Sequence, residues 1–231
     1  MTLYLIRIFV YTLLPLLAAW VITYIDPRIN THFRKLEVYL IFLFGFGVAG
    51  GGFGNFFGHF FVSDAVAKSI GWEPGSPFQL EMAFANLTLG VLGLIATGRR
   101  DGFREATVIA VTVLGVGATI VHFMDIIQSG NLAPGNTIQN IGNLLKPALL
   151  IGFLRASRRA EKEAPERDDR ERWREPHLQA VGWLTGMVLS GFGAGFFLGR
   201  LFLGTGLGIL AGALMIWLTL GRARKTAVPG T

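Results

Sequence analysis

Ionisable side chains occur inside the apolar segments of this sequence, where charged groups are rare and costly to bury. His59 and Glu81 lie near the facing ends of two such segments. His122 and Asp125 follow in the next segment, three residues apart, which places them on one face of a helix. Lys146 lies deep in the segment after that. Four successive segments therefore bring titratable groups toward one region.

Three kinds of chemistry fit these groups, and the sequence leaves all three open. The histidines can be hydrogen-bonded core residues, with Lys146 and a carboxylate forming a buried ion pair that fixes helix register. Alternatively, His59, Glu81, His122 and Asp125 can ligate a divalent metal, or the two histidines can clamp a haem. The third reading is an outward-facing pocket in which Lys146 holds an anion, or in which Glu81 and His122 relay protons.

Lys146 is the most constrained of these residues. A charge at mid-bilayer costs about 2.5 to 3.5 kcal/mol, so we expect its ammonium to face the bundle and to have a partner. We predict a carboxylate, Glu81 before Asp125. Pro147 lacks an N–H and so frees the carbonyl of Asn143. The candidate pocket residues are His59, Glu81, Asn86, His122, Asp125, Asn136, Asn143 and Lys146.

The composition shows which elements carry these residues. Hydrophobic residues make up 52% of the 231 residues and charged residues only 16%, with 31 glycines, which is typical of a polytopic membrane protein. Apolar segments near the roughly 20 residues that cross a bilayer run over 4–25, 38–62, 78–98, 105–127, 137–155, 178–199 and 201–220. The predicted fold is an all-α transmembrane bundle of about seven spans.

A charged segment divides the chain. Residues 156–176 carry basic and acidic side chains that nearly cancel, as in a solvated linker. This linker separates a five-span membrane core, residues 1–155, from a C-terminal hairpin with a basic tail, residues 177–231.

Glycines recur every four residues on several helix faces. They include Gly47 and Gly51 in the core and Gly182, Gly186, Gly204, Gly208 and Gly212 in the hairpin. Such faces predict close packing against helices of this chain, of a second copy or of a larger membrane complex, and the core row could also approach a flat cofactor.

Several function classes find no support. The net charge is +6, but the basic residues lie between apolar spans rather than in a stripe with aromatic residues that could stack on bases. The charge therefore does not indicate nucleic-acid binding. The absence of cysteine excludes disulfides and thiolate ligands. No nucleotide-binding or nucleophilic motif is visible. The sequence therefore favours a binding or assembly role in the bilayer over an enzymatic one, with a metal- or haem-binding redox protein as the alternative.

Local signals predict how the helices begin and end. Residues 76–79 have the Ser, Pro and Gln pattern of a capped helix start. Gly130 can end a helix in a left-handed conformation, and Asn136 can cap the helix that follows. Trp72 is expected to anchor a short helix at the membrane interface.

The run GWEPGSPFQLEMAFANLTLG, preceded by His59 and followed by His122, Asp125 and the GNLAPGN turn, resembles a family of small prokaryotic multi-pass membrane proteins classed as a domain of unknown function. The likeness covers about residues 38–150. It implies a helical membrane bundle without an assigned activity. The positions that the resemblance carries across are His59, Glu81, Asn86, His122 and Asn136.

Basic residues alternate between loops. They cluster after the first, third and fifth predicted spans and in the C-terminal tail, whereas the loops between hold few. Because basic loops stay in the cytoplasm, this pattern predicts a prokaryotic inner-membrane protein with its N-terminus outside and its C-terminus in the cytoplasm.

Reporter fusions test this orientation. A reporter joined after Thr231 should be active in the cytoplasm, and one inserted near Gly130 should be active outside it. Finding both reporters on the same side would overturn the seven-span arrangement.

Overall fold

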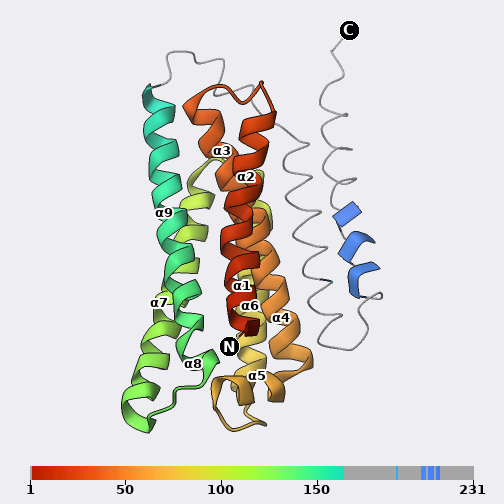
Figure 1. The fold of residues 1–231 in the computed structure, drawn as a ribbon, viewed down its shortest axis with the longest axis vertical. Coiled ribbons are helices and arrows are strands. Elements are labelled where there is room, and N and C mark those ends of the chain that lie inside the picture. Colours follow the sequence, from red (N-terminus) through yellow and green to blue (C-terminus); the bar gives the residue numbers. More distant parts are fainter. Residues whose placement is uncertain (1, 164–190, 192–203, 207, 211, 214–231) are drawn as a thin grey trace.

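The chain forms an all-α bundle in the computed structural model, which describes residues 2–163 and, of the C-terminal region, residues 191, 204–206, 208–210, 212 and 213. The helices in chain order are α1 (Thr2–Ile8), η1 (Phe9–Leu13), α2 (Leu14–Ile25), α3 (His32–Phe42), η2 (Leu43–Gly50), α4 (Gly51–Phe61), α5 (Ser63–Ile70), α6 (Phe78–Thr97), α7 (Gly102–Ser129), α8 (Pro134–Thr137) and α9 (Gln139–Glu163). The π-helical turns η1 and η2 join their neighbours, so α1 to α2 and α3 to α4 are two continuous helices (Figure 1).

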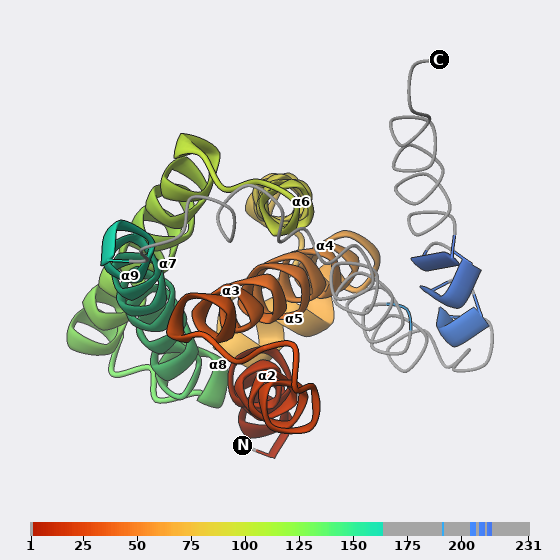
Figure 2. The ribbon, with the colours of Figure 1, turned by 90° about the horizontal axis from the view of Figure 1, so that it is seen from above.

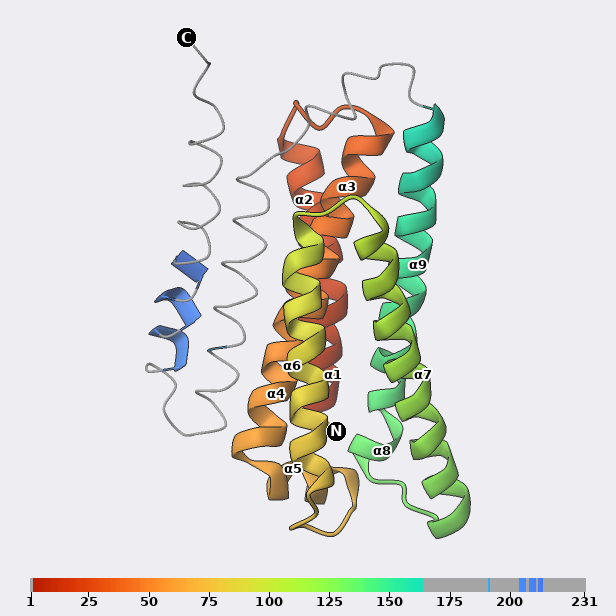
Figure 3. The same cartoon turned by 180° about the vertical axis from the view of Figure 1, so that it is seen from behind.

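Four helices among the described residues are long and apolar enough to cross a membrane, and they correspond to the first four predicted spans. These helices are Tyr4–Ile25, His32–Phe61, Phe78–Thr97 and Gly102–Ser129. The predicted fifth span, 137–155, corresponds to α9, which is less apolar because polar side chains occur in its first half and charged side chains crowd its last turns. It lies beside α7 (Figures 1 and 3). The last two predicted spans fall almost entirely outside the described residues.

The helix from α3 to α4 is the centre of the bundle. In its most apolar window 89% of the residues are buried, against 17% for the helix Tyr4–Ile25. Seen from above, α3 lies between α2, α6 and α9 (Figure 2). The remaining long helices therefore turn much of their apolar surface outward, as helices do that face lipid.

Glycines let this central helix touch its neighbours closely on two sides. A Cβ atom placed on Gly52 would lie 2.5 Å from the backbone nitrogen of Gly90 in α6. On another side, a Cβ atom on Gly51 would lie 3.6 Å from the Tyr11 ring of η1, and one on Gly47 would lie 3.0 Å from the Tyr11 carbonyl oxygen. The predicted glycine face thus packs against a helix, and Gly52 adds a second close contact.

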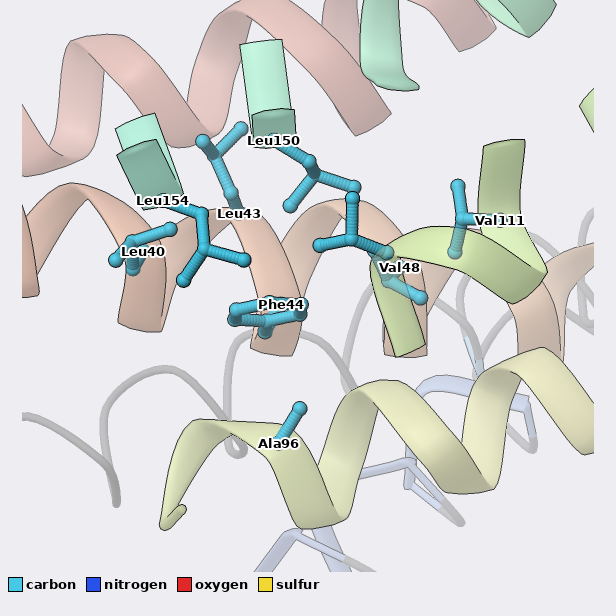
Figure 4. Packing of buried hydrophobic residues seen from close by; sticks show 9 residues of the cluster. Leu40, Leu43, Phe44, Val48, Ala96, Val111, Leu150 and Leu154 are labelled. Atoms are coloured by element: carbon cyan, nitrogen blue, oxygen red, sulfur yellow. The ribbon is translucent and has the colours of Figure 1, made fainter. Parts of the chain in front are cut away.

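The two ends of the bundle differ. We define the basic end by the loops 26–31 and 98–101, and the α5–α8 end as the opposite one (Figure 1). Toward the basic end, apolar side chains of four helices interlock; they are Leu40, Leu43, Phe44, Val48, Ala96, Val108, Val111, Leu150 and Leu154. Figure 4 shows the leucines of α9 meeting those of the central helix. Since lipid tails are as apolar as leucine, close packing stabilises this cluster.

A buried carboxylate joins the helices beside that cluster. Glu37 of α3 and Arg104 of α7 are each 2% exposed. Nη1 of Arg104 donates to both carboxylate oxygens at 2.9 Å, and its Nε donates to the Ala96 carbonyl at 3.0 Å. Nε of Arg100 lies 3.0 Å from the same carboxylate, and the Ser157 hydroxyl donates to it at 2.8 Å. Glu37 therefore connects α3 to α7, α9 and the α6–α7 loop.

The helix ends follow the sequence signals in part. The Ser76 hydroxyl accepts from the Phe78 N–H at 3.3 Å, at the start of α6. Gly130 ends α7 with a left-handed φ of 70°, as predicted. The prediction for Asn136 is wrong, because this residue lies inside the separate turn α8 and its side chain bonds to His122 instead.

Helix α9 runs to Glu163, so it extends past the predicted end of the core at residue 155 into the segment assigned to the linker. The rest of that segment, Gly182 and Gly186 lie outside the described residues. Farther along, a Cβ atom on Gly191 would lie 2.9 Å from the Cα of Gly208. This close approach agrees with the helix packing expected from the C-terminal glycine rows.

Removing one partner of the Glu37 pair should be strongly destabilising. Glu37→Met leaves the Arg104 guanidinium buried without its counter-ion, which costs about 3–5 kcal/mol of unfolding free energy. Combining it with Arg104→Met should recover much of that loss. A double-mutant cycle on unfolding in detergent measures the coupling.

The exposed pair of Arg99 and Asp101 supplies the control. The hydrogen bond from Arg99, followed by that from the Phe103 N–H, lowers the pKa of Asp101 below its usual value. Because both side chains are exposed, Arg99→Met should leave stability unchanged. Additive losses from Glu37→Met and Arg104→Met would contradict a coupled pair.

Candidate functional site

A cavity of about 520 Å³ occupies the half of the bundle toward the α5–α8 end. Side chains from α1, α4, α5, α6, α7, α8 and α9 form its wall. The polar groups on that wall include Arg7, Asn55, His59, Asn86, His122, Gln139, Asn143 and Lys146. Among the described residues, no aspartate or glutamate lines the cavity. Its charged lining is therefore cationic.

Arg7 of α1 is held in place by a chain of hydrogen bonds. Its guanidinium donates to Oδ1 of Asn55 in α4, and Nδ2 of Asn55 donates to Oδ1 of Asn86 in α6 at 3.1 Å. Nδ2 of Asn86 then donates to the Met82 carbonyl at 2.7 Å. Because arginine can only donate, this order fixes how both amides are oriented. The chain connects three helices across the cavity wall.

Lys146 of α9 reaches the same wall without a protein partner. No described residue forms a hydrogen bond or ion pair with its ammonium group. A Cβ atom on Gly51 would lie 3.1 Å from Nζ, so the glycine leaves room for the ammonium. A second cavity of about 60 Å³ is lined by Arg7, Tyr11, Asn55 and Lys146 among others. Both cations therefore border space that a ligand can occupy.

The predicted pairing of Lys146 with Glu81 or Asp125 is wrong. Glu81 is exposed and does not line the cavity. The face of α6 that lines it contains Phe78, Met82 and Asn86, and Glu81 is about 100° around the helix from Met82. Asp125 is engaged elsewhere, as described below. The helix that contains Glu81 does line the cavity, but Glu81 lies on a different side of that helix.

The two histidines that line the cavity are each held by an amide. Nδ1 of His59 lies 2.7 Å from Oε1 of Gln79, and Nδ1 of His122 lies 2.7 Å from Oδ1 of Asn136. Since an amide oxygen only accepts, each histidine carries its hydrogen on Nδ1 and keeps Nε2 as an acceptor when neutral. These are hydrogen-bonded histidines, as the first of the three readings expects.

Hydrogen bonds close the α5–α8 end of the cavity, and we term this set of contacts the latch. The Tyr4 and Ser69 hydroxyls are 2.6 Å apart. Nδ2 of Asn131 donates to the Ile70 carbonyl at 2.9 Å and to Asp125 at 2.7 Å. Nε1 of Trp72 donates to Asp125 at 2.8 Å. The latch joins α1, α5, α7 and the turn before α8.

Trp72, predicted to lie at the membrane interface, turns its ring toward the cavity. Its ring stacks on His122 with centroids 5.4 Å apart, and it lines the cavity. Asp125 thus positions an aromatic wall of the cavity.

Five of the eight predicted site residues line the cavity, namely His59, Asn86, His122, Asn143 and Lys146. Asn136 and Asp125 lie behind it and hold His122 and Trp72. Within the described part of the chain, no three His, Asp or Glu side chains are grouped as a metal site would require. The proposed ligands His59, Glu81, His122 and Asp125 are therefore not gathered.

Sequence reasoning missed Arg7, Asn55 and Gln139 as cavity residues. Arg7 lies inside the first predicted span, 4–25, and a lone arginine within an apolar helix is itself a signal of a functional site. Asn55 lies four residues after Gly51 and so shares the glycine face of the central helix, for which the sequence predicts close helix packing or approach to a flat cofactor. Glu37 is likewise an ionisable residue inside an apolar helix, and this indicates a buried partner, which the structure shows to be Arg104.

Residues 7–163 match the model of DUF6790, a family of unknown function. The chain belongs to this family. The DUF6790 match confirms the resemblance to a domain of unknown function and extends it beyond residues 38–150, from Arg7 of the cavity wall to the end of α9. No curated protein and no solved structure matches the chain.

The unpaired state of Lys146 in this DUF6790 protein has a testable consequence. Lys146→Met should raise the free energy of unfolding by on the order of 1 kcal/mol, because it removes a charge without a counter-ion near Arg7. Glu81→Gln should add to this change without coupling, as measured by a double-mutant cycle in detergent. If Lys146→Met instead caused a large loss of unfolding free energy, and Glu81→Gln restored it, Lys146 and Glu81 would form an ion pair after all.

Proposed function

We propose that this protein is a membrane-embedded binding protein whose cavity takes a small organic anion. The observation that carries the proposal is the pair of cations, Arg7 and Lys146, on a cavity wall to which no described residue contributes a carboxylate. In a low-dielectric bundle two like charges repel, and each is costly to keep charged. A bound carboxylate or phosphate group offsets both costs. The same charges disfavour a divalent cation at this site.

The neutral groups around the cations favour a specific site over a diffuse one. Asn55 orients the Arg7 guanidinium before any ligand arrives, which reduces the ordering cost of binding. Gln139 and Asn143 of α9 add amide donors on the wall that also holds Lys146. A volume of about 520 Å³ falls within the roughly 300–1,000 Å³ of small-molecule pockets.

The direction of access follows from the charge of the loops. The cavity is near the α5–α8 end, and the basic loops, with Arg28, Arg34, Arg99 and Arg100, are at the other end. By the positive-inside rule the cavity then faces the outside of an inner membrane. The ligand would come from the periplasm, the exterior or the outer leaflet.

Binding of butyl phosphate to the purified protein in phosphatidylcholine nanodiscs tests the proposal. Titration calorimetry should show binding of butyl phosphate and of butyrate, but not of butylammonium or butanol. Lys146→Met should weaken butyl phosphate binding about 10- to 100-fold, which corresponds to losing one charged hydrogen bond. Lys146→Arg should retain most of the affinity.

Lys68 supplies the matched control. It is an exposed lysine of α5 at the same end of the bundle and does not line the cavity. Lys68→Met should leave binding unchanged. Equal binding of butylammonium and butyl phosphate, or full affinity in Lys146→Met, would overturn the anion site.

A further inference from the structure

We infer that the anion is an amphiphile, an acidic headgroup on a single alkyl chain, and that it enters sideways from the lipid between α6 and α7. This inference rests on the proposed function and adds the class of ligand and its route. It depends on how polar and apolar groups divide the cavity wall, on where the cavity reaches the bundle surface, and on one glycine.

The wall is divided by chemistry. The cations and most amides come from α1, α4 and α9, as described above. The opposite side is mostly apolar. Besides the polar Asn86 and His122, it contains Phe78, Met82 and Leu89 of α6 and Val113, Leu114 and Val121 of α7. A ligand that fills the cavity therefore meets both cations and most donors at one side and mostly hydrocarbon at the other. An inorganic anion would leave the apolar side empty.

The apolar side is open to the surface of the bundle. Val113 and Val121 line the cavity and yet are 67% and 49% exposed. Figure 3 shows α6 and α7 leaving their shared loop and diverging toward the α5–α8 end. Both helices are among those apolar enough to cross a membrane, so this opening lies at the depth of acyl chains.

Gly117 of α7 marks space kept for a ligand. A Cβ atom added there would meet no heavy atom within 4 Å, although the residue lines the cavity. On the same helix, a Cβ atom on Gly115 would lie 2.5 Å from the Asn143 carbonyl of α9. Helix packing explains Gly115 but not Gly117. From Ala110 to Val121 the lining of α7 extends roughly 16 Å, room for an alkyl chain.

A chain-length comparison separates this inference from the proposed function. In phosphatidylcholine nanodiscs, Gly117→Leu should lower the ratio of dodecyl phosphate to butyl phosphate affinity about tenfold, because leucine fills the apolar side. Gly152→Leu is the matched control, since Gly152 is an exposed glycine of α9 with equally open surroundings outside the cavity. Gly152→Leu should leave the affinity ratio unchanged. Because leucine has a higher helix propensity than glycine, both substitutions are compatible with their helices.

A photoreactive probe locates the chain directly. Dodecyl phosphate with a diazirine at the chain end should label the lining residues of α6 and α7, and Lys146→Met should reduce that labelling about tenfold. Labelling confined to lipid-facing positions such as Ile109 and Ile127, with no effect of Lys146→Met, would mean membrane partition only and would overturn the inference.

The outcomes for the two proposals are distinct. If butyl phosphate binds but Gly117→Leu weakens both phosphates equally, or if the chain end labels no lining residue, the amphiphile inference fails and the anion site stands. If the affinity for neither phosphate depends on Lys146, both the anion site and the amphiphile inference fail.

Discussion

The buried carboxylate of Glu37 is the interaction on which the rest of the bundle depends. Arg104, Arg100 and Ser157 all donate to it or pair with it, from the start of α7, the α6–α7 loop and α9. Since desolvating a charge costs several kcal/mol, such a group persists only while every partner is in place. It therefore fixes four parts of the chain at the basic end, where the apolar cluster is closely packed. Helices fixed at one end can diverge at the other without losing their register.

At the α5–α8 end the helices α6 and α7 do diverge (Figure 3). There polar groups from several helices line a cavity, and among the described residues Lys146 and Arg7 share a wall without a counter-ion. A structure optimised only for stability would pair these charges or replace them by apolar side chains. One end of the bundle thus provides rigidity, and the other keeps unsatisfied groups at fixed positions, which is the arrangement expected of a binding site.

The sequence was informative about where residues lie along the helices, but not about which way their side chains face. Hydropathy and helix caps located the first four spans and brought His59, His122 and Lys146 to one level, and all three line the cavity. The predicted pair of Lys146 and Glu81 rested on position along the helices, which does not tell which way a side chain faces. Arg104 falls between the predicted spans 78–98 and 105–127, whereas it is buried in the first turn of α7. Facing depends on tertiary packing, which one sequence does not encode in an easily readable form.

For a ligand bound in the cavity, the latch would make the two exits kinetically unequal. A molecule leaving toward water has to separate the Tyr4–Ser69 contact and the bonds that Asn131 and Trp72 make with their partners. A molecule leaving between α6 and α7 would pass valine side chains and a glycine and would break no hydrogen bond. Residence time would then be set by the lateral gap, and the aqueous end would act as a closed floor. Exchange would be fast with the bilayer and slow with bulk solvent, even for a ligand soluble in both.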